Sequence, residues 1–460
     1  MIGLPPFLSF SENERILQLK ILMIILRTVK NISSLNIAAS VLLFLAAILA
    51  AVVANSSLSP VYQDFLLQEL HLRIGNFNLF SHGGHPLKMI EFINDCLMTV
   101  FFLAVGLEIK RELLVGELSS VRKAALPFIA ACGGMVVPVV IYALSVASGT
   151  PETRGMAIPM ATDIAFSLGV LSLLGKRVPL SLKIFLTAFA VVDDIGGILV
   201  IALFYSADVA YGYLIAAAVL YVFLYYMGKF GVTQKIFFLF FGVIIWYLFL
   251  QSGIHSTISG VILAFVIPAR PRLDAGKYIE RIRDIIGEFP VSKSDNIVLT
   301  NAQIATLKQV ERASDYVISP LQSLEDNLHG TVSFVILPLF AFANAGVVFS
   351  GSGSIVGDVS IAVAAGLLLG KFLGIYLFTW LAVKSGVALM PAGMNWKNIA
   401  GVSLLGGIGF TVSLFIANLS FADEYPELLN QAKFGVLVGT VLAGVLGYVV
   451  LNWVLPKRKK

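Results

Sequence analysis

Residues 181–205 of the chain read SLKIFLTAFAVVDDIGGILVIALFY. Apart from Lys183 near its start, the charged residues of this stretch are Asp193 and Asp194 at its centre. A helix needs roughly 20 apolar residues to cross the hydrocarbon of a bilayer, whereas a barrel strand alternates polar and apolar residues over about ten. The stretch does not alternate, so it predicts a transmembrane helix with two carboxylates at mid-depth.

Comparable apolar runs recur along nearly the whole chain. Of its 460 residues, 58% are hydrophobic and 13% are charged, whereas soluble domains carry about 25% charged residues. The mean hydropathy is +0.90. We therefore predict an all-α polytopic membrane protein with about twelve transmembrane helices. The predicted spans cover residues 36–56, 88–109, 124–147, 156–174, 181–205, 209–228, 235–251, 254–268, 330–349, 359–383, 398–420 and 431–455.

The charged residues outside the spans predict the orientation. Basic residues concentrate in the short loops after the even-numbered spans, for example Lys176 and Arg177. The positive-inside rule places these loops, and both termini, in the cytoplasm. The net charge of +5 thus reflects topology, and we expect no nucleic-acid partner.

The same reading divides the chain into five parts. These are a cytoplasmic segment at 1–35 with an interfacial helix, spans 1–8 at 36–268 with an external loop at 57–87, a charged cytoplasmic insert at 269–329, spans 9–12 at 330–455, and a basic cytoplasmic tail at 456–460. Within the external loop, Gly75 and Asn76 lie between apolar flanks, which predicts a hairpin at 70–80. We expect this hairpin to form a homodimer contact.

The informative residues are five ionisable groups inside the apolar part of predicted spans: Asp95, Asp163, Asp193, Asp194 and Lys371. A charge at the centre of a membrane helix costs roughly 2.5 to 3.5 kcal/mol on insertion scales. A fold stable by roughly 5 to 15 kcal/mol does not retain five such residues without a use for them. We expect them to face a wet cavity or one another.

The adjacent pair Asp193 and Asp194 predicts a site for a cation. Neighbours on a helix are about 100° apart, so both carboxylates can border one cavity without forming a dyad. A carboxylate can be neutralised by a proton or can bind a hard cation through its oxygens. Protons and Na⁺ would therefore compete for this site. Lys371 either neutralises one of the aspartates or snorkels from near a span end.

Two spans are predicted to be interrupted. In span 4, Pro159 precedes Thr162 and Asp163, and in span 11 the break falls at Gly406, Gly407 and Gly409. Spans 3–5 and 10–12 would then be inverted-topology repeats. Asp163 would compensate exposed positive helix ends, and Lys371 the negative ones.

A dense charge cluster, Glu108 to Glu112, and a histidine, His255, lie near predicted span ends. Histidine titrates near physiological pH. From the residues alone, a solvated helix face and a satisfied polar histidine remain the alternatives to a functional role.

Four longer stretches resemble signatures of the bacterial NhaA Na⁺/H⁺ antiporters. They are FFLAVGLEIKREL at 101–113, ATDIAF at 161–166, VVDD at 191–194 and LPLFAFANAG at 337–346. The resemblance runs from about residue 35 to 455 and omits the insert; NhaA is itself a known example of interrupted spans.

The resemblance implies a pH-regulated, electrogenic antiporter of the inner membrane. It would expel Na⁺ or Li⁺ against a larger number of protons by alternating access, without a cofactor, and so maintain sodium and pH homeostasis. Asp194 would be the central Na⁺ ligand, and Asp193 would exchange between a proton and a salt bridge to Lys371. Thr162 and Asp163 match the unwound crossing of span 4 and complete the ion site. Residues implied in pH sensing are Glu108, Arg111, Glu112, His255 and Glu325.

Three features depart from the family pattern. Phe372 stands where a proline commonly follows the lysine, Gly330 and Thr331 replace a Pro-Trp pair, and the insert at 269–324 is unusually long. The insert leaves the mode of pH regulation open.

Other functions fit the sequence less well. A sodium-coupled symporter of an organic solute is the main alternative, but no group specific for a solute is apparent. A channel would need a filter-like sequence. An intramembrane aspartyl protease would need its two aspartates on different helices, and Asp193 and Asp194 are adjacent.

Overall fold

The computed structural model describes residues 37–75, 77–82, 85–205, 209–270, 275–287, 300–349, 354–422 and 424–456. The interfacial helix predicted within residues 1–35 lies outside this part of the chain, as do Asn76 of the predicted hairpin turn and all but the first residue of the tail at 456–460.

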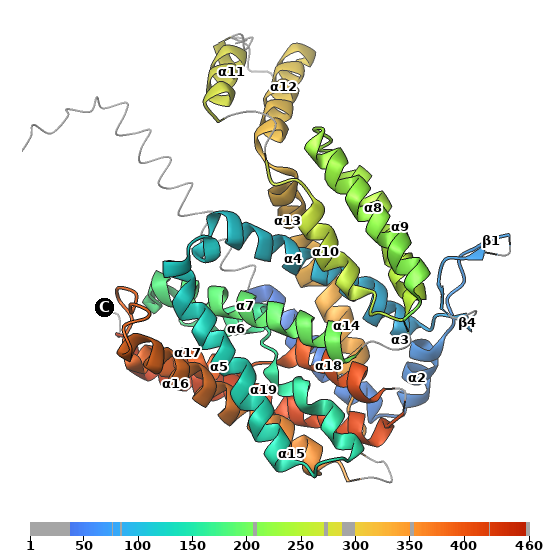
Figure 1. Ribbon diagram of the computed structural model, residues 1–460, viewed down its shortest axis with the longest axis vertical. Helices are drawn as coiled ribbons and strands as arrows, with labels where there is room; N and C mark the ends of the chain where they lie inside the picture. The colour runs from blue at the N-terminus through green and yellow to red at the C-terminus, as the bar shows by residue number, and fades with distance from the viewer. Residues whose placement is uncertain are drawn as a thin grey trace, which may run out of the picture.

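Most of the described chain is helical (Figure 1). Nine are long and apolar enough to cross a membrane, or eleven if two bent pairs each count as one span, all within the described residues. The nine are Ile37–Ala54, Met89–Val115 (α3, η1 and α4), Val121–Ser145 (α5), Leu180–Phe204 (α7), Tyr211–Lys229 (α8), Lys235–Ser252 (α9), Pro320–Asn344 (α13, η5 and α14), Asp358–Lys384 (α15, η6 and α16) and Pro426–Val454 (α19). An all-α polytopic membrane protein is thereby confirmed.

Three of these long helices each contain a π-helical turn. The composite helices are α3 (Met89–Phe92), η1 (Ile93–Leu97) and α4 (Met98–Val115); α13 (Pro320–Thr331), η5 (Val332–Ile336) and α14 (Leu337–Asn344); and α15 (Asp358–Ala365), η6 (Gly366–Gly370) and α16 (Lys371–Lys384). The composite helix of α13, η5 and α14 continues without interruption through Gly330 and Thr331. Lys371 directly follows η6, so a local widening of the helix precedes this lysine although Phe372 replaces the usual proline.

The two bent pairs lie where interruptions were predicted. In the first, η3 (Pro151–Met160) and α6 (Ile164–Leu173) meet at 45°; in the second, α17 (Trp396–Leu405) and α18 (Phe410–Phe421) meet at 44°. Pro159 lies inside η3 rather than at the break, which falls at residues 161–163.

Polar groups in and just after the first break pair with backbone carbonyls in and just before the second. Thr162 Oγ1 donates to the carbonyl of Gly406 at 2.8 Å, Ser167 Oγ to that of Leu405 at 3.0 Å, and the amide of Asp163 to that of Ile408 at 2.6 Å. The last carbonyls of a helix have no partner within it, and an unpaired carbonyl in hydrocarbon is costly. The two breaks therefore stabilise each other.

Glycines allow α5 and α16 to pack backbone against backbone. A Cβ on Gly374 would lie 2.1 Å from the carbonyl oxygen of Gly133, and one on Gly134 would lie 3.7 Å from Cδ of Lys371. The absence of side chains at these positions brings the Lys371 segment against α5.

Replacing Gly374 with Ala should therefore destabilise the protein. The added methyl group overlaps backbone, so the two helices must separate at a cost of about 1 to 3 kcal/mol. Thermal unfolding in detergent measures the change. The control is Gly212→Ala in α8, where a Cβ would meet nothing within 4 Å. Equal stability of the two variants would contradict a tight α5–α16 contact.

The remaining elements are short or lie outside the bundle. They are α2 (Ser59–Leu67), β1 (Arg73–Ile74), β2 (Phe77–Asn78), β3 (Ser81–His82), β4 (His85–Pro86), η2 (Glu117–Ser119), η4 (Gly175–Arg177), α10 (Thr257–Val266), α11 (Ala275–Gly287) and α12 (Asn301–Val317). Strands β1 and β2 pair antiparallel through the Gly75 turn. Helices α11 and α12 of the insert project beyond α13, away from the bundle (Figure 1).

Candidate functional site

A cavity of about 290 Å³ enters the bundle between α4, the first break and α13. Its polar lining falls into two groups, one at its mouth and one at its floor. Glu108, Arg111, Glu325, His329 and Ser333 belong to the first, and Thr162, Asp163 and Asp194 to the second; the apolar lining is Ala39, Phe101, Ala104, Val105, Ile164, Ala165, Leu168, Val332, Leu337 and Val412.

The two adjacent aspartates face different surroundings. Asp194 lines the cavity, and its carboxylate accepts no hydrogen bond from any described residue. Asp193 is 1% exposed and does not line the cavity. Its Oδ2 lies 2.5 Å from Nζ of Lys371, which is fully buried. The rotation of about 100° between helix neighbours thus separates an accessible carboxylate from a paired one.

Asp163 closes the floor of the cavity by bonding both breaks. Its Oδ1 accepts from the amide of Phe166 at 2.9 Å, which caps α6, and its Oδ2 accepts from Thr411 Oγ1 at 2.6 Å and from the Thr411 amide at 3.2 Å. Two helix amino ends therefore converge on one carboxylate, as expected where exposed amides meet an anion.

Replacing Thr411 with Val should weaken this crossing. The variant keeps the shape of the side chain but leaves the buried Asp163 Oδ2 without its hydroxyl donor, at a cost of about 1 to 3 kcal/mol. The thermal midpoint in detergent should fall. Thr411→Ser keeps the hydroxyl and should retain most of the stability; if Val and Ser variants unfold at the same temperature, the bond contributes nothing.

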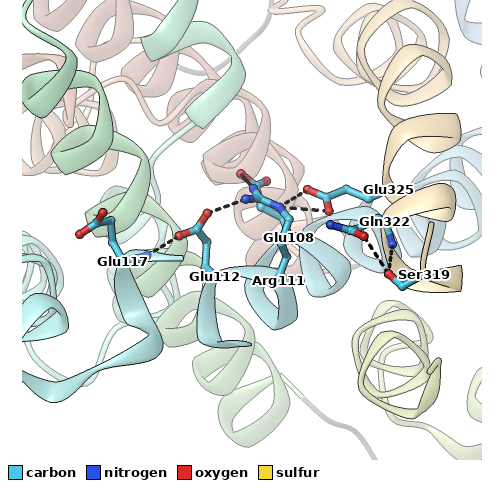
Figure 2. Close-up of polar contacts among 7 residues, drawn as sticks. All are labelled: Glu108, Arg111, Glu112, Glu117, Ser319, Gln322 and Glu325. Carbon is cyan, nitrogen blue, oxygen red and sulfur yellow. Dashed lines mark hydrogen bonds and ion pairs between the residues drawn. The ribbon is translucent and has the colours of Figure 1, made fainter. Parts of the chain in front are cut away.

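An ion-pair cluster lies at the mouth of the cavity (Figure 2). Arg111 bonds Glu325 of α13 through Nε at 2.8 Å and Glu112 through Nη1 at 2.9 Å, and its Nη2 lies 4.0 Å from Glu108. Glu112 also accepts from the amide of Glu117 at 3.0 Å. Residues 214 positions apart, Arg111 and Glu325, are therefore in direct contact.

His255 does not join this cluster. It precedes α10 and neighbours Ser256, whose hydroxyl lies 3.4 Å from Asp95 Oδ1. The other end of α10 is the one nearest to the cluster, because Ile267 there contacts Lys110. Four of the five residues implied in pH sensing are thus brought together, and His255 is kept apart by the length of α10.

Two cavity residues, His329 and Ser333, were not assigned a role from the sequence. Together with Glu325 and Leu337 they line the cavity at every fourth position along one helix. This spacing places side chains on one helix face, so it is the signal that could have identified them.

The geometry suits reversible binding of a proton or a small cation. Asp194 offers free carboxylate oxygens, the ligands of hard cations, at the end of a cavity whose mouth carries further carboxylates. No cluster of three or more metal-ligating side chains is found among the described residues. Asp194 is the carboxylate of the floor that accepts no hydrogen bond from the described residues, and it lies next to the buried pair of Asp193 and Lys371.

The sequence model of the family described as Na⁺/H⁺ antiporter 1 matches residues 30–451. The chain belongs to this family. Relatives named Na(+)/H(+) antiporter NhaA include proteins from Bacteroides fragilis, 75% identical over 95% of this chain and 100% of the relative, and Phocaeicola vulgatus, 62% identical over 89% and 92%. One from Porphyromonas gingivalis is 47% identical over 94% and 96%.

Membership of the Na⁺/H⁺ antiporter 1 family confirms the resemblance seen in the four motifs. The match extends from before the first apolar helix to the last turns of α19, so it covers the whole helical bundle. The chain is therefore a multi-pass membrane protein of a transporter family.

Proposed function

We propose that the protein exports Na⁺, and also Li⁺, in electrogenic exchange for protons across the bacterial inner membrane. The observation that carries this proposal is that the two adjacent aspartates have different surroundings. Of the two, Asp194 faces the cavity, while Asp193 is held by Lys371 at 2.5 Å. Protons and Na⁺ compete for Asp194, and proton exchange at Asp193 breaks or restores the pair with Lys371.

We propose that the cavity is the cytoplasmic half of an alternating-access path. The loops that carry most basic residues and the Arg111 cluster lie at the ends of predicted spans on the same, cytoplasmic side. Thr162 and Asp163, at the floor, would complete the ion site when Na⁺ reaches Asp194.

The twelve-span topology is part of the proposal. Counting the nine long helices, the two bent pairs and the short helix α10 gives this number within the described residues. Spans 3–5 and 10–12 then form inverted repeats, supported by the contact between their breaks, in which Thr162 donates to Gly406 and Asp163 to Ile408. An even number of spans places both termini on the same side, and the positive-inside rule makes that side the cytoplasm.

We further propose that the Arg111 cluster regulates transport with pH. It joins three carboxylates from two helices at the entrance to the ion path, so a change in their protonation would alter both the local charge and the contact between α4 and α13. A homodimer contact through the hairpin at 70–80 is compatible with the pairing of β1 with β2.

The test is ion-driven proton movement in everted membrane vesicles. A pH-sensitive dye reports the lumen after respiration has acidified it, and NaCl or LiCl is then added at pH 6 to 9. Na⁺-dependent alkalinisation that is faster with an inside-positive potential than without one is expected. No response at any pH, with the protein correctly inserted, would overturn the proposal and favour a sodium-coupled symporter.

A further inference from the structure

Lys110 lies in the charge cluster from Glu108 to Glu112, but its side chain contacts the end of another helix, α10. Its Nζ donates to the backbone carbonyls of Phe265 at 2.7 Å and of Ala264 at 3.3 Å, and also to that of Ile267. All three carbonyls belong to the last turn of α10 or directly follow it. The side chain is therefore committed to another helix.

The length of α10 explains why a cation is needed there. Its ten residues rise about 15 Å, whereas the hydrocarbon layer is about 30 Å thick. The last carbonyls of a helix lack partners and carry partial negative charge. A lysine ammonium has three N–H donors and no acceptor, which matches three convergent carbonyls.

Close packing makes α4 and α10 a single unit below this cap. A Cβ on Gly260 would lie 2.4 Å from the carbonyl oxygen of Thr99, and one on Gly106 would lie 2.8 Å from Cβ of Ala264. Movement of α10 relative to α4 is therefore resisted along its length and at its end.

The capped end of α10 also contacts the helix that forms the cavity mouth. The amide of Leu321, in the first turn of α13, donates to the carbonyl of Pro268 at 3.2 Å. One turn further, Glu325 bonds Arg111, the neighbour of Lys110 (Figure 2). The contacts form a closed ring from Lys110 through Ile267, Pro268, Leu321 and Glu325 to Arg111.

We propose that Lys110 is a positioning residue for the ion path. By capping α10 it fixes Pro268, which fixes the start of α13 and hence the distance between Glu325 and Arg111 at the cavity mouth. The inference rests on the proposed antiport and deepens it. Loss of the cap would displace the carboxylates that attract cations to the mouth, while leaving Asp194 at the floor intact.

The test compares Lys110→Met with Lys123→Met, which removes the same charge from an exposed lysine at the start of α5. In Na⁺-driven dye assays, Lys110→Met should raise the apparent KM for Na⁺ about fivefold. An effect of this size is typical where a residue acts on a site through packed helices without contacting the ligand. The maximal rate should not change. Lys123→Met should match the wild type, and Lys110→Arg, which keeps a cation and several donors, should restore most of the affinity.

A second comparison separates positioning from simple loss of stability. In a Glu325→Gln background the Lys110→Met change should add little, because the ring is already broken. An unchanged KM in Lys110→Met, or an equal rise in both backgrounds, would overturn the inference. If Lys110→Met does not insert, Lys110→Gln takes its place; it removes the cationic charge but keeps two amide donors, so a smaller rise in KM is expected, with an unchanged KM again overturning the inference.

Hydrogen exchange provides a readout that does not depend on transport. Peptides containing the Leu321 amide should exchange faster in Lys110→Met than in Lys123→Met, and equal protection would overturn the inference. If wild-type vesicles show no Na⁺-driven proton movement, the proposed function fails, whereas the exchange measurement still reports on the ring.

Discussion

Replacing Asp194 with Asn is expected to abolish Na⁺-driven proton movement while the protein is still made and inserted. The substitution keeps the size of the side chain but removes the carboxylate that lines the cavity and its ability to take up a proton. The rate should fall by at least about 100-fold, since even groups that only support a metal ligand contribute about 10- to 100-fold to affinity. The dye assay in everted vesicles at alkaline pH measures this loss.

The matched control is Asp64→Asn in α2, where the aspartate is exposed. It removes an equal charge from the surface and should leave the rate unaltered. Na⁺-driven proton movement that survives in Asp194→Asn, with inserted protein verified by immunoblot, would mean that another group carries the exchange. The proposed site would then be wrong.

Replacing Lys371 with Met should destabilise the protein more than any other single change considered above. Lys371 is fully buried, and its Nζ lies 2.5 Å from Asp193 Oδ2, so its removal leaves a buried carboxylate without a counter-charge. Loss of one partner of a buried ion pair costs about 3 to 5 kcal/mol. Unfolding in detergent, induced by heat in one experiment and by denaturant in another, measures the loss of stability.

The double variant Asp193→Asn/Lys371→Met should recover much of this stability, because neither charge then remains in the interior. Lys384→Met, at the end of the same helix, is the control. Its ammonium lies 4.4 Å from the ring centroid of Trp380 at an exposed position, so the expected cost is only about 0.5 to 1 kcal/mol. A Lys371→Met protein as stable as Lys384→Met would show that the buried pair is not charged.

Local sequence patterns predicted the elements of the fold but not every boundary. The apolar runs indicated the long helices, and Pro159 and the glycines from Gly406 to Gly409 indicated the two interruptions. The first break lies beyond Pro159 because η3 accommodates the proline, while Thr162 and Asp163 leave the helix to bond Gly406 and Ile408, which follow α17.

The candidate site was predicted in part. The cost of burying charge identified Asp163, Asp193, Asp194 and Lys371, and the family resemblance added Glu325. His329 and Ser333 were not identified because neither residue type is unusual at such positions. The cap formed by Lys110 was not identified because, in the sequence, a lysine that caps a helix cannot be distinguished from a lysine at a span end that only sets the topology.

The sequence by itself determined that this is a multi-pass membrane protein and that carboxylates occur where burial is expensive, and it predicted interruptions at the places where two helix pairs bend. These properties depend on composition and on spacing along one helix. Only the tertiary structure decided that Asp194 faces the cavity while Asp193 meets Lys371, and that Arg111 meets Glu325. Such pairs lie far apart in sequence, and close helix packing, as at Gly133 and Gly374, determines which side chains come within bonding distance.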